Sequence, residues 1–184
     1  MVIARMGYSR ELCYELFLQD GSKGNDLWEL LWEAGQEFKI SAGGPNIILR
    51  LEGGILSYLA DIDRSNNPYE VGLDWLVDLE QEDDFIGKEA LRLVCQNGPT
   101  KKLMGAEIHG DPIEDSNADH WPVFINGKKV GSMNAMVYSP RLDKNICYTI
   151  LDIEHAKSGQ EIVIAAPEKD LMATTIDLPW RERA

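Results

Sequence analysis

The sequence predicts an α+β fold, in which a region of mixed strands and helices is followed by a small antiparallel β-barrel. In residues 1–99, short strand-like runs alternate with amphipathic helix patterns. After Thr100 the helix patterns stop, and short runs of alternating apolar residues follow one another with turn residues between them, which is typical of a small barrel or sandwich. We therefore expect two domains, residues 1–99 and residues 100–184.

The first domain is expected to begin with a hairpin formed by strands at residues 2–6 and 12–19. A helix capped by Asn25 or Asp26 follows and ends near Phe38, because its apolar residues recur at helical spacing. The remaining predicted elements of this domain are a helix at residues 47–52 ended by Gly53-Gly54, a strand at residues 71–79, and a helix at residues 86–95 capped by Asp84.

The second domain is predicted to hold only strands and turns. Asn126-Gly127 predicts a two-residue type I′ hairpin, since both residue types accept the positive φ that this turn needs. His109, His120 and His155 lie in separate loops, and we expect them to be neither metal ligands nor catalytic bases. The predicted strands are residues 102–109, 121–125, 129–138, 145–153, 161–165 and 171–177.

The composition limits the classes of partner and the cellular compartment that we expect for this chain. The net charge of −13 argues against a nucleic-acid or anionic-membrane partner, because both would be repelled. Cys13, Cys95 and Cys147 are far apart in sequence, so neither a disulfide framework nor a zinc site is predicted. No apolar run approaches the roughly 20 residues that cross a bilayer, and no signal-peptide pattern opens the chain. We expect a cytoplasmic protein.

Glu15 is the first candidate for a functional residue. With the two-residue period of a strand it shares a face with Cys13 and Phe17, so its carboxylate lies among apolar neighbours. A carboxylate there must reach water or meet a donor, since burying it unpaired costs on the order of several kcal/mol. The residues alone leave two interpretations open: Glu15 binds a ligand rich in N–H groups, or it lies on the solvated face of an edge strand.

Four segments, in this order and spacing, resemble the aminomethyltransferase (glycine-cleavage T-protein) family. Residues 7–16, Gly-Tyr-Ser-Arg-Glu-Leu-Cys-Tyr-Glu-Leu, resemble the family's G-Y-T-G-E-x-G-x-E-[IL] motif. Residues 49–54, 84–91 and 138–146 resemble L-R-L-E-A-G, D-F-I-G-[KR]-E-A-L and F-S-P-x-L-x-K-x-I. The resemblance covers nearly the whole chain, and it implies a folate-binding α+β region followed by a small β-barrel domain.

The resemblance also implies one-carbon chemistry on tetrahydrofolate, with a methyl or aminomethyl group taken from a small donor. It implies that Glu15, the second glutamate of the first motif, pairs with the N–H edge of the pterin. A carboxylate suits that edge because its two oxygens can accept from two adjacent donors. Tyr8 and Phe17 line the same pocket in relatives. Asn46 and Arg50, around the second motif, complete the candidate cofactor-binding residues.

The chain departs from the family pattern at several positions. Arg10 and Cys13 stand where the first motif has glycines, and a positive φ at residue 10 would be strained. Residues 45–47, Pro-Asn-Ile, replace the family's A-R-D and remove an arginine that glycine-cleavage members use near the glutamate tail of folate. The pattern from Gly44 onward resembles the dimethylsulfoniopropionate demethylase branch, whose members move a methyl group from sulfur to tetrahydrofolate.

The largest departure is that the family's first half has no counterpart before Met1. That half includes the aspartate that activates the folate nitrogen in glycine-cleavage members. We therefore expect this polypeptide to be the C-terminal half of a larger enzyme, poorly active alone, with no catalytic residue of its own. It would need the N-terminal half or a second copy of itself as a partner. The alternative is a non-catalytic folate-binding or assembly protein of the same fold.

Overall fold

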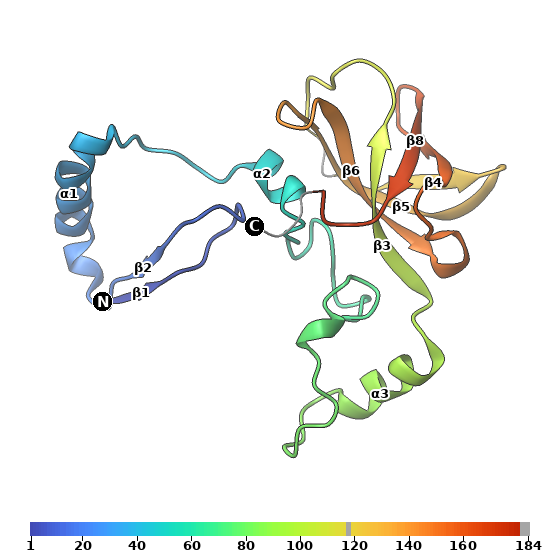
Figure 1. The fold of residues 1–184 in the computed structure, drawn as a ribbon, viewed down its shortest axis with the longest axis horizontal. Helices are drawn as coiled ribbons and strands as arrows, with labels where there is room; N and C mark the ends of the chain where they lie inside the picture. The colour runs from blue at the N-terminus through green and yellow to red at the C-terminus, as the bar shows by residue number, and fades with distance from the viewer. Residues whose placement is uncertain (117–118, 181–184) are drawn as a thin grey trace. The chain divides into compact units, whose positions relative to one another are not determined.

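The computed structural model describes residues 1–116 and 119–180. The chain divides into two compact units, Met1–Arg50 and Leu51–Ala184. The first holds a short hairpin and a long helix, and the second holds a closed antiparallel barrel (Figure 1). The α+β class with a small barrel is therefore confirmed. The domain boundary predicted between residues 99 and 100 stays a prediction.

The hairpin of the first unit consists of β1 (Val2–Ala4) and β2 (Glu15–Phe17), which pair antiparallel. The ladder is shorter than predicted, and the connection between the two strands folds back on itself, with Cys13 Sγ 3.3 Å from Glu11 O and 3.4 Å from Met6 O. The thiol contact with Met6 O links the two arms of the connection, which do not pair as strands. The longer strands predicted at residues 2–6 and 12–19 were therefore wrong in extent.

The long helix α1 (Gly24–Gly35) confirms the amphipathic pattern, and a 3₁₀ turn, η2 (Gln36–Phe38), extends it to the predicted end. The predicted cap at Asn25 or Asp26 was wrong, because a further 3₁₀ turn, η1 (Gly21–Lys23), precedes the helix. The side chain of Asp20 caps that turn by accepting from Ser22 N at 3.1 Å. Asp26 lies in the first turn of α1, where its negative charge interacts favourably with the helix dipole and stabilises the helix.

The strand predicted at residues 71–79 was also wrong. Pro68 O accepts hydrogen bonds from Val71 N (3.4 Å) and Leu73 N (2.9 Å), which curls the chain into turns. A 3₁₀ turn, η3 (Asp74–Leu76), follows. The alternating apolar residues here match the period of a strand, but local turn hydrogen bonds take the backbone groups that a ladder would use.

The helix predicted at residues 86–95 is confirmed as α3 (Lys88–Asn97). Its predicted cap, Asp84, was wrong, because Gly87 precedes the helix with a φ of 93° and the chain enters through that left-handed residue. Lys88 Nζ donates back to Gln81 O (2.7 Å) and Asp83 O (3.2 Å), so the acidic loop before the helix is tied to its first residue.

The barrel closes in the strand order β3-β6-β5-β4-β7-β8, with neighbouring strands antiparallel. All six predicted strands are present, each end within a residue of its predicted position. Asn126 and Gly127 have φ values of 50° and 78°, which confirms the predicted turn between β4 and β5. The bounds are β3 Lys101–Ile108, β4 Trp121–Ile125, β5 Lys128–Ser139, β6 Lys144–Asp152, β7 Glu161–Ala165 and β8 Asp170–Ile176.

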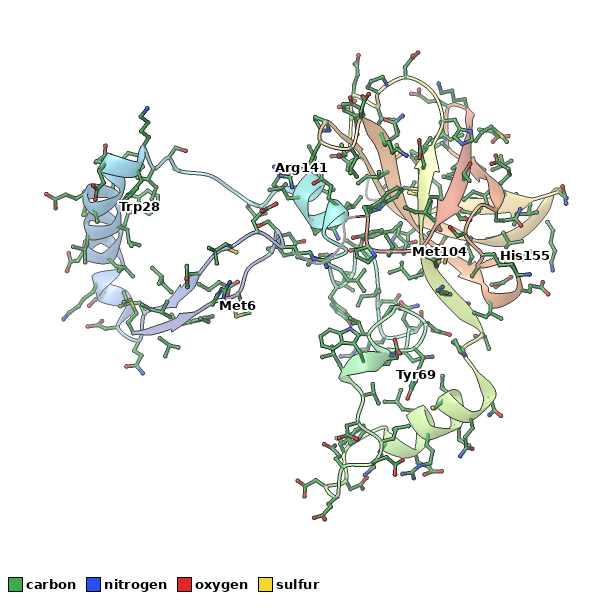
Figure 2. The ribbon with its side chains drawn as sticks, in the orientation of Figure 1. Met6, Trp28, Tyr69, Met104, Arg141 and His155 are labelled. Atoms are coloured by element: carbon green, nitrogen blue, oxygen red, sulfur yellow. The ribbon has the colours of Figure 1, made fainter. Side chains whose placement is uncertain are left out.

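The hydrophobic core of the second unit fills the barrel. Met104 on β3 lies within it (Figure 2), fully buried with side chains from each of the other strands. The alternation that predicted the strands places these apolar side chains on the inner face of the barrel. Within the described part of the chain, no helix is long and apolar enough to span a membrane. The fully buried apolar members include Met104, Val123, Met133, Cys147, Leu151, Ile164 and Ala173.

Candidate functional site

Glu15 lies on an open apolar face of the β1–β2 hairpin. The register pairs Ala4 with Glu15 and Val2 with Phe17, so these four side chains point to the same side of the ladder. Glu15 is half-buried, whereas Val2 and Phe17 are 55% and 51% exposed. The predicted neighbour Phe17 therefore shares the face, but Cys13 lies before the strand and does not. A ligand that covered this face would bury two apolar side chains and meet one carboxylate.

Tyr8 lies in the connection between the two strands and is 44% exposed. A Cβ at Gly7, the residue before Tyr8, would collide with Cys13 Sγ, so a larger residue there would displace the thiol. Arg10 takes a φ of 59°, the left-handed conformation that its replacement of a motif glycine predicted. The connection that presents Tyr8 is therefore held by close packing and by one strained residue.

Arg50 lies in the helix α2 (Ile47–Glu52), and Asn46 comes directly before it. Asn46 is its N-cap: the side-chain oxygen accepts from Ile48 N at 2.9 Å and from Leu49 N at 3.2 Å. Arg50 N donates to Asn46 O at 3.1 Å, and the Arg50 side chain is 3% exposed. The structure thus brings these two candidates onto one helical turn, with the Asn46 side-chain oxygen occupied by the cap.

The end of α2 meets the barrel through residues that sequence analysis did not single out. Ser139 Oγ donates to Glu52 Oε1 at 2.6 Å, and Arg141 Nε lies 3.7 Å from Glu52 Oε2. Tyr148 Oη donates to Leu51 O at 2.9 Å. The signal was present in the sequence, because Glu52 and Ser139 belong to two of the four motif segments. Nothing in their spacing showed that those segments meet.

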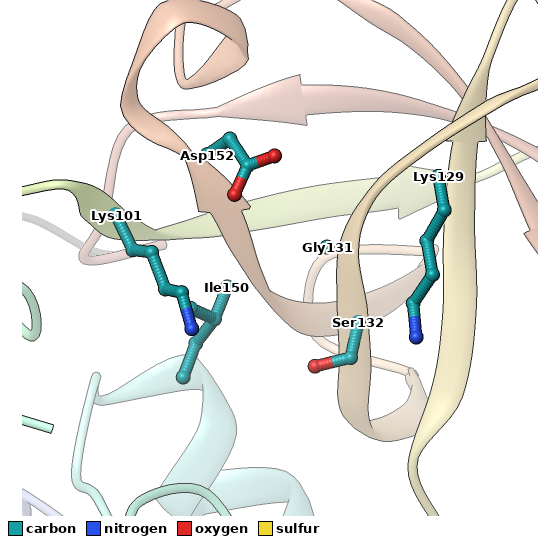
Figure 3. Close-up of a pocket in the computed structure, with 6 residues that line it drawn as sticks. All are labelled: Lys101, Lys129, Gly131, Ser132, Ile150 and Asp152. Atoms are coloured by element: carbon teal, nitrogen blue, oxygen red, sulfur yellow. The ribbon is translucent and has the colours of Figure 1, made fainter. Parts of the chain in front are cut away.

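A pocket of about 300 Å³ lies on the outer surface of the barrel and was not predicted either (Figure 3). Two lysines and one aspartate line it from three different strands. The sequence does not show which strands are neighbours, so this grouping could not be predicted from it. The residues that line the pocket are Lys101, Lys129, Gly131, Ser132, Ile150 and Asp152.

The histidines make surface contacts at separate places in the second unit. His109 Nε2 is hydrogen-bonded to Thr174 Oγ1 at 2.8 Å, and His120 Nε2 donates to Ala60 O at 2.9 Å. His155 Nε2 lies 3.1 Å from Glu154 Oε1. Among residues 1–116 and 119–180, no three His, Cys, Asp or Glu side chains are grouped so that they could hold a metal ion.

Comparisons with known proteins show which family the chain resembles in sequence and in fold. Residues 1–81 match the GCVT N-terminal domain model, and residues 101–180 match the model of the glycine cleavage T-protein C-terminal barrel domain. In fold, 98% of the chain matches 50% of the glycine cleavage system aminomethyltransferase T from Bartonella henselae, with a TM-score of 0.83 and 22% sequence identity.

Two curated relatives extend the comparison. The chain is 32% identical to the dimethylsulfoniopropionate demethylase of Ruegeria pomeroyi over 98% of its own length and 49% of the relative's. It is 33% identical to the aminomethyltransferase of Symbiobacterium thermophilum over 98% of its length and 48% of the relative's. The chain thus spans about half the length of the curated relatives it matches. By these matches, which together cover both of its halves, the chain belongs to the glycine cleavage T-protein family.

Proposed function

We propose that this chain forms the C-terminal half of a tetrahydrofolate-dependent one-carbon transferase, and that its hairpin binds the pterin. The observation that carries the proposal is the position of Glu15, a half-buried carboxylate on an open apolar face beside Phe17. Such a face suits a flat heterocycle with an N–H edge, because the ring covers the apolar side chains while the carboxylate accepts from adjacent donors.

Tyr8 and Phe17 would contact the pterin ring from the hairpin. Both are large aromatic side chains, 44% and 51% exposed, so a ligand could cover them without displacing other parts of the hairpin. Each aromatic side chain that stacked on the pterin would contribute area burial and about 0.5–1.5 kcal/mol from the ring contact. Asn46 would serve a more remote part of the folate through its amide N–H₂. Arg50 would lie behind Asn46 on the same helical turn, because it is 3% exposed and its N–H donates to Asn46 O.

We further propose that another half of the family's length completes the site. The first unit leaves large apolar side chains exposed on α1 and on both hairpin strands, and a two-stranded sheet is marginally stable by itself. In this proposal the other half covers those side chains and supplies the groups that act on the one-carbon donor. The exposed set includes Val2, Ile3, Phe17, Trp28, Leu30 and Leu31.

The relatives support the donor class that we propose. One relative is a dimethylsulfoniopropionate demethylase and another is an aminomethyltransferase, so the proposed donor is a small molecule with a methyl or aminomethyl group on sulfur or nitrogen. The transferred group would go to tetrahydrofolate held by the hairpin. With Pro-Asn-Ile at residues 45–47, we favour a demethylation over glycine cleavage.

The test is a product assay on a family-length polypeptide in which a relative's N-terminal half precedes this chain. We expect methyl-tetrahydrofolate to form from at least one methylated sulfur or nitrogen donor, and this chain alone to form at least 100-fold less. Tetrahydrofolate binding without turnover of any donor would favour the non-catalytic folate-binding alternative. Failure to bind tetrahydrofolate at all would contradict both.

A further inference from the structure

The lysines on the barrel strands fall into two groups. Lys102, Lys128 and Lys144 each form an ion pair, with Asp177 (3.1 Å), Glu154 (3.1 Å) and Glu107 (2.6 Å). Within the described part of the chain, the ammonium groups of the other two, Lys101 and Lys129, form no hydrogen bond or ion pair at contact distance. In a chain with a net charge of −13, two strand lysines are thus left without a carboxylate at contact distance.

Lys101 and Lys129 are the two lysines that line the pocket of about 300 Å³. Lys101 starts β3 and Lys129 lies on β5, and Figure 3 shows their side chains on opposite sides of Ser132 and Ile150. A second pocket of about 130 Å³ shares Lys101, Ser132 and Ile150 with it, so the two hollows adjoin. The ammonium groups therefore approach one small space from two sides.

The wall between the lysines is held by strand pairing and buried hydrogen bonds. At Gly131 any side chain would collide with Ile150 O, so glycine allows β5 to lie tightly against β6. Ser132 Oγ donates to Asn134 Oδ1 at 3.1 Å, and Asn134 Nδ2 donates to Asp61 O at 2.6 Å. Asn134 is 1% exposed, so the wall is formed before any ligand arrives.

Two aspartates also face this space. Asp152 lines the pocket and is paired with Lys101 across the β3–β6 ladder. Asp63 lines the adjoining hollow, where hydrogen bonds from Ser65, first from its side chain, lower the pKa of Asp63, and the charges of His120 and Lys101 add to this effect. Both carboxylates therefore repel an anion in this space, Asp152 from the pocket itself and Asp63 from the adjoining hollow.

We propose that this pocket binds a small dicarboxylate, with one carboxylate on Lys101 and the other on Lys129. Two separated ammonium groups match two separated carboxylates, and each charge-assisted hydrogen bond is stronger than a neutral one. A volume near 300 Å³ is at the lower end for ligand pockets, which favours a molecule with a short carbon chain. Because the lysines are exposed, binding should weaken as salt screens them.

The experiment is an amide chemical-shift titration of the whole ¹⁵N-labelled chain with malonate, succinate, glutarate and adipate, and with acetate as the single-carboxylate reference. We expect saturable shifts centred on Gly131, Ser132 and Ile150, one preferred chain length, and at least fivefold tighter binding than for acetate. Lys101→Gln and Lys129→Gln should each weaken the preferred dicarboxylate at least fivefold. Asp152→Asn should tighten it, because it removes a repelling charge.

Lys102→Gln and Lys128→Gln are matched controls. Each removes the same charge from the neighbouring position of the same strand, where the lysine already has a carboxylate partner. We expect both controls to bind within twofold of the unmodified chain. Equal weakening by controls and pocket variants would overturn the proposal, since it would indicate a general charge effect. Tighter binding of inorganic phosphate than of every dicarboxylate, or shifts that do not saturate, would overturn it as well.

Discussion

Ser139 Oγ donates a 2.6 Å hydrogen bond to Glu52 Oε1 and so joins two motif segments that lie 87 residues apart in the chain. Glu52 ends α2, and Ser139 ends β5. Both are fully buried, and Arg141 lies beside the second carboxylate oxygen. Two of the four segments that resemble the family's motifs thus attach this helix end to the barrel.

Ser139→Ala should destabilise the second unit by about 1.5–3 kcal/mol, because it removes a hydrogen bond to a buried charged group. The measurement is the free energy of unfolding in urea, followed by circular dichroism. The matched control is Ser158→Ala, at an exposed loop serine, which should change the stability by less than about 0.5 kcal/mol. Equal stability of the two variants would contradict the role given to Ser139.

Asn145→Ala should loosen the loop that follows β3. Asn145 is 3% exposed; its Oδ1 accepts from Ile113 N at 2.9 Å, and its Nδ2 donates to Asp111 O at 2.9 Å. Loss of these buried bonds should cost about 2–3 kcal/mol. Hydrogen exchange at Ile113 N should become at least tenfold faster, while exchange within the β5–β6 ladder changes only by the global loss of stability. Unchanged protection at Ile113 would contradict this account.

Gly127→Ala should lower the free energy of unfolding by about 1 kcal/mol or more, because Gly127 has a φ of 78° in the β4–β5 turn. Gly21→Ala is the control, at a position with open space around it and no left-handed φ. We expect no loss of stability there. Thermal unfolding of the two variants side by side gives the comparison, and a Gly127→Ala melting temperature equal to that of the control would refute the turn assignment.

Cys147 should make the barrel less stable in alkali. Its thiol is fully buried, and burial raises its pKa to about 12 from an ordinary value of 9.0. Between these two values the unfolded chain loses the thiol proton and the folded chain keeps it, so stability falls as the pH rises from about 9 to about 12.

Urea unfolding at pH 8 and pH 10.5 tests the effect of Cys147. The unmodified chain should lose more stability between the two pH values than Cys147→Ala does, because the variant has no thiol to titrate. The quantity compared is the loss of stability between pH 8 and pH 10.5 in each protein. Truncating the buried side chain lowers the stability of Cys147→Ala at both pH values, so that cost cancels. A variant that lost as much stability as the unmodified chain would show that the Cys147 thiol is not protected by burial.

The barrel could be predicted from the sequence because its information is local. Alternating apolar residues located each strand, and Asn126-Gly127 located a turn whose φ values only such residues adopt easily. The strand predicted at residues 71–79 failed although its alternation was just as regular, because hydrogen bonds to Pro68 O curl the chain there. Periodicity reports which side chains can share a face, but not whether a neighbouring strand is present.

The candidate site also has a part that the sequence predicted and a part that it did not. The face shared by Glu15 and Phe17 followed from the two-residue period, and the resemblance supplied a ligand for it. The contact between Glu52 and Ser139 and the pocket between Lys101 and Lys129 are formed by residues distant in sequence. The contact between α2 and the end of β5 forms the first grouping, and the pairing of β6 with β3 and β5 forms the second, so no motif spacing could have predicted either.

Calorimetric titration with tetrahydrofolate tests the central claim most directly, on this chain and on a family-length polypeptide that contains it. In whichever preparation binds, Glu15→Gln should weaken binding at least tenfold, because it removes the charge that faces the pterin N–H edge. Glu33→Gln, at an exposed glutamate of α1, should bind within twofold of the unmodified protein. Undiminished affinity in Glu15→Gln, or no binding by either preparation, would contradict the account.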